Sequence, residues 1–89
     1  MKQQALYETL WQAGQGREED IVLRCGDKSL SYGALFQGIL QAEAGLRALG
    51  VGPGELVTLF SLNTPEAVMA FYAIERIGGV ANWVDMKVS

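Results

Sequence analysis

Residues 30–57 read LSYGALFQGILQAEAGLRALGVGPGELV, and this stretch decides the fold. Ser31 suits the N-cap of a helix, because its hydroxyl can accept a hydrogen bond from a free backbone N–H of the first turn. Apolar side chains recur at spacings of four and three through residues 35–49, which predicts an amphipathic helix whose wide apolar stripe packs on a sheet. Gly50 predicts a left-handed C-terminal cap. The Pro-Gly pair at 53–54 predicts a turn into a strand.

The glycines at residues 50–54 contain a G-x-G pattern, but they run in the wrong direction for a phosphate loop. A phosphate cradle leads from a strand through glycines into a helix N-terminus, where free N–H groups and the positive end of the helix dipole lie. Here a helix comes first and presents carbonyl groups, and Pro53 has no N–H to offer. Residues 61–66 run from strand to helix, but they lack glycine and Glu66 would repel an anion. We expect helix capping at this junction and no cofactor-binding residue in either segment.

The segments before the long helix predict a short helix and a hairpin. Apolar side chains recur at helical spacing through residues 3–13, and two glycines then stop the pattern. Residues 21–24 and 29–30 flank a turn at residues 26–28, which predicts a small β-hairpin with glycine in the turn. Strands this short are expected to serve as scaffold.

The segments after the long helix predict a strand, a helix and a second strand. Residues 56–62 form a nearly continuous apolar run, typical of a strand that is covered on both faces in a parallel sheet. Asn63 or Thr64 is expected to cap the next helix, with Pro65 in its first turn. Residues 80–84 predict the second strand. The sequence therefore predicts an α/β fragment: a short β-hairpin plus a right-handed βαβ unit, with helices packed on a partly parallel sheet.

Composition places the chain among globular proteins and excludes several classes of function. The 89 residues are 49% hydrophobic and carry a net charge of −3, which suggests one domain or part of one. The seven Lys and Arg residues are scattered, which argues against partners such as nucleic acid or an anionic membrane surface. No run approaches the roughly 20 apolar residues of a membrane span, and the start does not read as a signal peptide. We expect a soluble protein with no membrane span.

Cysteine and histidine usage argues against metal and nucleophilic sites. Cys25 is the only cysteine and the chain has no histidine. This excludes a metal cluster held by several thiols, as well as a catalytic Cys-His or Ser-His pair within the chain. A single cysteine also fits a reducing, cytoplasmic setting. Glu43 and Arg47 lie four residues apart and are expected to pair on the solvent-facing side of the long helix. The residues thus predict no catalytic, cofactor-binding or metal-binding site in this chain.

Four motifs in series resemble those of one enzyme superfamily. Residues 30–35, LSYGAL, resemble its first core motif, and residues 46–57, LRALGVGPGELV, resemble its LxxLGVxxGDxV stretch. Residues 63–66, NTPE, resemble its usual NSPE, and residues 74–85, IERIGGVANWVD, resemble its second core motif, LKAGAAYVPLD. In order and spacing the chain is similar to the start of the AMP-forming acyl-CoA synthetase, luciferase and peptide-synthetase adenylation superfamily.

Three positions depart from the family pattern. Ala34 stands where the first motif usually has Glu, and Ile77 replaces the usual Ala. The proline that the family usually has before the terminal aspartate is absent, and Val84 directly precedes Asp85. The ending at residues 82–85 is closer to acyl-CoA synthetases than to peptide-synthetase domains. These departures bear on the subfamily more than on the family.

The resemblance implies that residues 1–89 are the N-terminal portion of an AMP-binding domain. In the parent enzyme ATP, accompanied by magnesium, would activate a fatty or other carboxylic acid as an acyl-adenylate, and coenzyme A would take the acyl group. The family's phosphate loop, ribose-binding aspartate and catalytic lysine lie downstream of this stretch, so the resemblance assigns none of these roles here. The isolated chain is expected to be inactive and to have the remainder of that enzyme as its partner.

Three other interpretations remain open. In the first, the chain is a freestanding α/β interaction module that self-associates, because a lone βαβ unit leaves strand edges unpaired. In the second, the chain is part of a peptide-synthetase-type adenylation domain. The third is a nucleotide-binding regulator built on the βαβ unit, against which the missing glycine loop argues.

Overall fold

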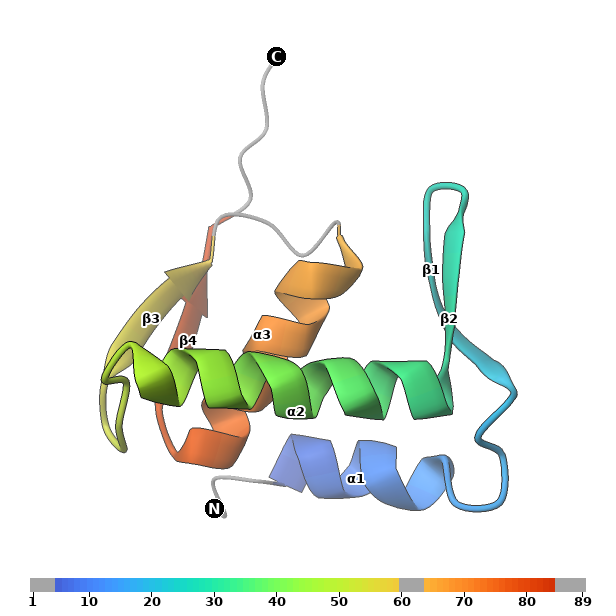
Figure 1. Cartoon of the computed structure of the whole chain (residues 1–89), viewed down its shortest axis with the longest axis horizontal. Helices are drawn as coiled ribbons and strands as arrows, with labels where there is room; N and C mark the ends of the chain where they lie inside the picture. The colour runs from blue at the N-terminus through green and yellow to red at the C-terminus, as the bar shows by residue number, and fades with distance from the viewer. Residues whose placement is uncertain (1–4, 60–63, 85–89) are drawn as a thin grey trace.

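The computed structural model describes residues 5–59 and 64–84. The elements in chain order are α1 (Ala5–Ala13), β1 (Ile21–Cys25), β2 (Lys28–Ser31), α2 (Tyr32–Ala48), β3 (Leu56–Leu59), α3 (Pro65–Ile77) and β4 (Val80–Trp83). Figure 1 shows the β1–β2 hairpin rising from one end of α2 and the β3–β4 pair lying near the other end. The predicted α/β class, with a hairpin and a strand-helix-strand unit, is confirmed.

β1 and β2 form the antiparallel hairpin that the sequence predicts, with Cys25 opposite Lys28. Gly26 has a φ of 65°, whereas Asp27 has a negative φ. A positive φ at the first central position alone is the pattern of a two-residue type II′ turn. Both strands run slightly longer than predicted, because the turn takes two residues and not three.

α2 begins and ends as its sequence predicts. The Ser31 hydroxyl accepts a hydrogen bond from an N–H of the first turn at 3.2 Å. At the other end Gly50 has a φ of 93°, and its N–H donates to the carbonyl of Arg47 at 3.0 Å. The N–H of Val51 donates to the carbonyl of Leu46 at 3.0 Å. These two bonds make a Schellman motif, which satisfies carbonyls that the helix itself leaves free.

A type II turn leads from the end of α2 into β3, as predicted. The N–H of Glu55 donates to the carbonyl of Gly52 at 3.2 Å. Pro53 occupies the second position, and Gly54 has the positive φ, 81°, that the third position of this turn requires. The N–H of Gly54 also donates to the carbonyl of Gly78 at 2.9 Å. The turn therefore ties the start of β3 to the end of α3.

β3 and β4 are parallel neighbours joined through α3, and Leu56 lies opposite Val80. Thr64 caps α3, because its Oγ1 accepts a hydrogen bond from the N–H of Ala67 at 3.2 Å. Asn63, the other candidate cap, and the last three positions of the predicted strand 56–62 lie outside the described residues.

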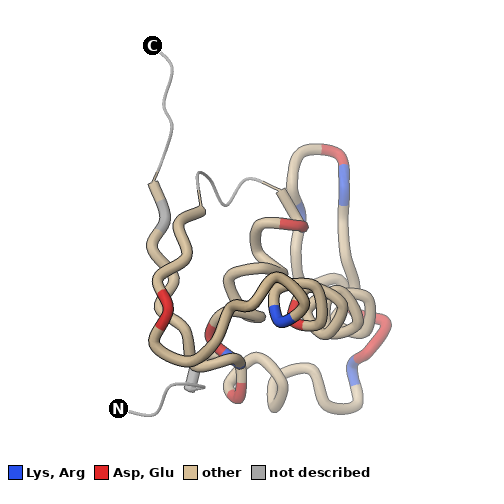
Figure 2. The backbone as a smooth tube through the Cα atoms, turned by 60° about the vertical axis from the view of Figure 1, so that its left-hand side comes forward, with Lys and Arg blue, Asp and Glu red and all other residues tan. Residues whose placement is uncertain are grey.

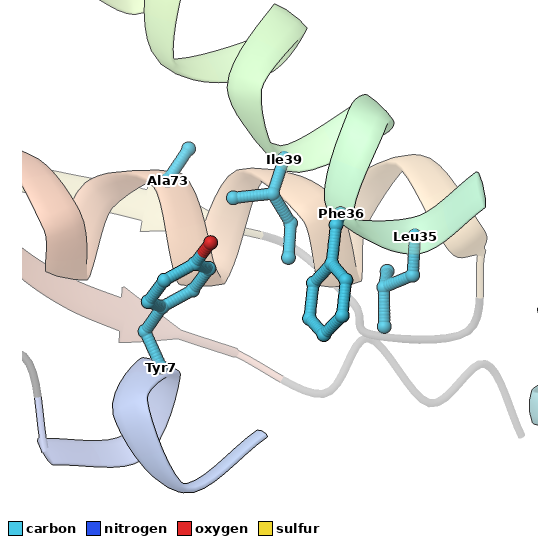
Figure 3. Close-up of a cluster of buried hydrophobic side chains, with 5 residues drawn as sticks. All are labelled: Tyr7, Leu35, Phe36, Ile39 and Ala73. Atoms are coloured by element: carbon cyan, nitrogen blue, oxygen red, sulfur yellow. The ribbon is translucent and has the colours of Figure 1, made fainter. Parts of the chain in front are cut away.

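The core lies between the three helices. Figure 3 shows Tyr7 of α1, Leu35, Phe36 and Ile39 of α2, and Ala73 of α3 gathered in one cluster. α2 packs on α3, which lies between it and the β3–β4 pair (Figure 1). The prediction that the stripe of α2 packs on a sheet is therefore wrong. The reason is that α3 is apolar on two sides, so it contacts the sheet with one side and α2 with the other.

Glycine allows α2 to approach its neighbours closely. A Cβ added at Gly38 would collide with the side chain of Met69 in α3. A Cβ added at Gly14, after α1, would lie 2.7 Å from the ring of Tyr32. Aromatic rings therefore leave no room for a side chain at Gly14, whereas at Gly38 the flexible end of Met69 must shift to admit one.

Candidate functional site

Two features of the described residues carry polar chemistry or an open surface, and the first is a charged cluster between the helices. Glu43 of α2 accepts a hydrogen bond from Arg76 Nε of α3 at 2.6 Å and another from Arg47 Nη2 at 3.1 Å. The guanidinium of Arg76 also lies over the ring of Tyr7 of α1, 4.6 Å from its centroid. One arginine therefore contacts side chains of both neighbouring helices.

The predicted Glu43–Arg47 pair exists, but its place differs from the prediction. Only 15% of the Glu43 side chain is exposed, so the carboxylate does not lie on the solvent-facing side. Sequence reasoning missed Arg76, which lies 33 residues further along the chain. A signal was present, because Glu75 and Arg76 are charged residues within a helix that is otherwise largely apolar.

The cluster shifts the pKa values of its members. Desolvation alone would raise the pKa of Glu43, but the hydrogen bonds from Arg76 and Arg47 outweigh it, and the pKa lies below its ordinary value. The hydrogen bond to Glu43 raises the pKa of Arg76, so this arginine stays charged at every ordinary pH. The pair is ionised on both sides, which suits a structural ion pair and not a proton-transferring group.

Glu75 holds the start of α1. Its carboxylate oxygens accept hydrogen bonds from the backbone N–H groups of Leu6, at 3.0 Å, and Tyr7, at 2.8 Å. The first N–H groups of a helix have no partner within the helix, and a carboxylate is favoured there by the helix dipole. Glu75 therefore does for α1 what Ser31 does for α2, although it comes from another helix.

The second feature is the β3–β4 pair, which is covered on one face only. Alternation along the strands turns Val57, Leu59 and Ala81 toward α3, and these residues are partly buried. The other face carries Leu56, which is 65% exposed, and Val80, which is 49% exposed. In Figure 2 the helices lie to one side of the two strands and no described element lies on the other side. The expected cover on both faces is therefore absent from the described residues.

A hollow of about 340 Å³ adjoins this pair of strands. Its lining residues come from α1, α3, the turn after α3 and the start of β4: Leu6, Phe71, Glu75, Gly79, Val80 and Ala81. The lining is apolar apart from Glu75, whose carboxylate is already bound to α1. The lining offers no cation that would bind a phosphate or a carboxylate substrate.

The two segments weighed above as phosphate loops, residues 50–54 and 61–66, are described to different extents. The segment at 50–54 follows the C-terminus of α2 and leads into β3, which is the order that the sequence predicts and the reverse of a phosphate loop. At the other junction Thr64 caps α3, and residues 60–63 lie outside the description.

Metal-binding clusters and membrane-spanning helices are both absent from the described residues. Within ranges 5–59 and 64–84, no three acidic, cysteine or histidine side chains come together in a way that could hold a metal ion. Across the same ranges, no helix combines the length and the apolar character needed to cross a membrane.

Residues 10–89 match the family described as AMP-binding enzyme. The chain is 32% identical over 75 residues to the 3-hydroxybenzoate–CoA/4-hydroxybenzoate–CoA ligase of Thauera aromatica, covering 84% of this chain and 14% of that protein. It is 32% identical over 78 residues to the medium/long-chain-fatty-acid–CoA ligase of Mycobacterium tuberculosis, covering 86% of this chain and 13% of that protein. The chain thus spans only a small part of the curated relatives that it matches.

The fold is similar to part of a solved anthranilate CoA ligase. The TM-score is 0.83, and the match covers 92% of this chain and 16% of that one at 24% identity. A likeness at this identity concerns the fold alone. It agrees with the α/β arrangement of hairpin, helices and parallel strands described above.

Proposed function

Because the chain belongs to the AMP-binding enzyme family, we propose that residues 1–89 form the N-terminal portion of the AMP-binding domain of an acid–CoA ligase. In such an enzyme ATP, with Mg²⁺, activates a carboxylic acid as an acyl-adenylate, and coenzyme A then takes the acyl group. The match over residues 10–89 carries this proposal. The four motifs noted above, in order and at natural spacing, support it.

We propose that this segment supplies framework and no catalytic group. Adenylyl transfer needs cations and hydrogen-bond donors positioned around the phosphates. The charged residues at the centre of the described structure are committed to one another or to a helix end, as Glu43, Glu75 and Arg76 show. This commitment supports the proposal that the segment holds no site for ATP, Mg²⁺ or coenzyme A, and we assign no step of the reaction to it.

The acid substrate is proposed only as a class, fatty or other carboxylic acids. Relatives of nearly equal similarity are named for hydroxybenzoates and for medium- and long-chain fatty acids. This spread supports a segment that is shared by ligases of different acids and that does not select among them. A role in fatty-acid metabolism and a cytoplasmic location stay predictions. Membership of a peptide-synthetase-type adenylation domain is the alternative within the family.

An activity assay tests this proposal. The purified chain, incubated with ATP, Mg²⁺, coenzyme A and a panel of fatty and aromatic acids, is expected to release no pyrophosphate and to form no thioester. A complete benzoate CoA ligase run in parallel controls for the assay. Turnover by the 89-residue chain would overturn the framework role. A reading frame that continues past Ser89 into a Ser/Thr/Gly-rich loop supports the ligase, and a stop codon there favours a freestanding module.

A second candidate function is a self-associating α/β module. The bare face of the β3–β4 pair favours it, because exposed apolar surface and unpaired strand edges promote association. We propose that the isolated chain self-associates. Sedimentation velocity over a wide concentration range tests this, and a single monomeric species at the highest concentration would contradict it.

A further inference from the structure

The face of the β3–β4 pair that points away from α3 is largely apolar and carries no charge. Leu56 of β3 lies beside Val80 of β4, and the two residues are 65% and 49% exposed. Val84 follows on the same side of the chain by alternation and is 43% exposed. Thr58 and Asn82, which complete the bare face, are polar and exposed but uncharged.

The direction of these strands makes an open face unusual. β3 and β4 are parallel, and parallel strands occur almost only in sheets that are covered on both faces. α3 covers one face of the pair, where Val57, Leu59 and Ala81 are partly buried. The bare face therefore calls for a second layer, which the described residues do not supply (Figure 2).

The length of the relatives points to the source of that layer. The match to the hydroxybenzoate ligase covers 84% of this chain and 14% of that protein. In a ligase of that length, most of the polypeptide lies outside this segment and is attached to it covalently. A covalently attached layer acts at a high effective concentration, whereas a second copy of the chain must associate from solution. The remainder of the ligase is therefore favoured over a separate molecule.

The bare face also restricts the chemistry of the layer. None of its five residues carries a charge, so it offers no ion-pair partner to a charged side chain placed against it. Burying a charge without a partner is costly. The covering layer should therefore be apolar where it meets Leu56, Val80 and Val84.

We propose that the bare face is the surface on which the remainder of the AMP-binding domain packs, with an apolar layer over Leu56, Val80 and Val84. The two strands are then covered on both faces, as is usual for parallel strands. This inference rests on the proposed function and gives the partner named there a place on the chain. Self-association of the isolated chain is then a consequence of the missing layer.

Cysteine labelling in a chimeric ligase tests the inference. The chimera carries residues 1–89 in place of the corresponding segment of the 3-hydroxybenzoate–CoA/4-hydroxybenzoate–CoA ligase of Thauera aromatica. Leu56→Cys and Val80→Cys report on the bare face. Leu40→Cys, on α2, is the matched control, because Leu40 is 50% exposed. Peptide mass spectrometry measures the rate of maleimide labelling at each position in the chimera and in the isolated chain at low concentration, and circular dichroism verifies folding.

We expect the two face positions to label roughly tenfold more slowly in the chimera than in the isolated chain, because a closely packed layer excludes the reagent. Leu40→Cys is expected to label equally fast in both. If one face variant does not fold, the other still reports, because the two positions lie side by side on different strands.

Three results would overturn the inference. The first is unchanged labelling at both face positions in a folded chimera. The second is equal slowing at Leu40, which would show that the protection is not specific to this face. The third is a chimera that does not fold, because the face would then not fit the remainder of a ligase to which the chain is 32% identical.

Activity of the chimera separates this inference from the proposed function. Thioester formation is measured with hydroxybenzoate, ATP, Mg²⁺ and coenzyme A. A folded chimera with a protected face and no thioester would count against the proposed ligase and leave the packing surface standing. Thioester formation with rapid labelling at both face positions would leave the ligase standing and overturn the packing surface.

Discussion

At the scale of single residues, Arg76 connects the three helices. Its guanidinium bonds to Glu43 of α2 at 2.6 Å and covers the ring of Tyr7 of α1 at 4.6 Å. The arginine itself is in the last turn of α3. A planar guanidinium suits this place, because its edge donates hydrogen bonds while its face stacks on an aromatic ring.

Arg76→Ala is expected to lower the free energy of unfolding by about 1–2 kcal/mol, because it leaves the mostly buried Glu43 carboxylate with one partner and removes the contact with Tyr7. Arg76→Lys keeps the charge and should recover part of the loss, but not the planar stacking. Arg17→Ala is the control, since Arg17 pairs with Asp20 on the surface and its loss should change little. Urea unfolding followed by circular dichroism measures all three. Equal stability of the Arg76 and Arg17 variants would contradict the expectation.

The lowered pKa of Glu43 predicts a loss of stability in acid. A carboxyl whose pKa is lower in the folded state stabilises the fold above its unfolded pKa, near the ordinary value of 4.5, and this contribution disappears as the pH falls through the folded pKa. Arg76 remains charged throughout, so it does not alter the sign. Unfolding free energy measured from pH 6 downward should therefore decline below about pH 4.5. Glu43→Gln should flatten that decline, and an unchanged slope would count against the role of Glu43.

At the scale of elements, α2 shows how glycine acts differently at two positions of one helix. Gly38 faces Met69 of α3 so closely that a Cβ would collide, whereas a Cβ at Gly45 would meet nothing within 4 Å. Both positions are inside the helix, where glycine is disfavoured relative to alanine by up to ~1 kcal/mol. Packing therefore opposes alanine at the first position only.

Gly45→Ala is expected to stabilise the chain by up to ~1 kcal/mol, because it adds helix propensity without a collision. Gly38→Ala is expected to stabilise the chain less than Gly45→Ala does, because the flexible end of Met69 must shift to admit the Cβ. Adding Met69→Ala to Gly38→Ala should relieve the collision, although it also removes apolar contacts. Thermal unfolding compares the four chains. The interpretation is wrong if Gly38→Ala stabilises the chain as much as Gly45→Ala does.

The boundaries of the elements could be predicted from sequence, whereas the contacts between them could not. Ser31, Thr64 and Gly50 act on their own helix through hydrogen bonds that span three to five residues, so their meaning is local. The bond between Arg76 and Glu43 depends on how α2 crosses α3, and no local pattern specifies that crossing. For the same reason, the apolar stripe of α2 does not reveal that α3 covers it and not a sheet. Its width predicts burial without naming the partner.

At the scale of the whole molecule, the chain combines a closed helical core with an open sheet. Ile39 and Ala73 are fully buried between the helices, while the β3–β4 pair is covered on one face in the described structure. A segment with its own buried core can hold its shape, and its open face marks where the remainder of a ligase is proposed to pack.

This contrast predicts a gradient of hydrogen exchange. Amides in the middle of α2 and α3 should exchange most slowly, because they surround the buried cluster. Amides of β3 and β4 should exchange faster, since one face of these strands is exposed. Exchange measured by NMR at low chain concentration avoids protection by association. Equal protection of the two parts would show that the sheet is as stable as the helical core.

The bond between Glu75 and the start of α1 also has a consequence for synthesis. The two hydrogen bonds join residues 69 and 68 positions apart, so they close nearly the whole chain. A ribosome adding about 5–20 residues per second makes the start of α1 roughly 3–14 seconds before it adds the glutamate that caps it. During that interval the start of the nascent helix lacks the carboxylate that accepts its hydrogen bonds, although Phe36, whose ring lies 6.2 and 4.9 Å from those of Tyr7 and Trp11 in the folded chain, is made well before Glu75. The start of α1 therefore gains these hydrogen-bond acceptors only once α3 has been made.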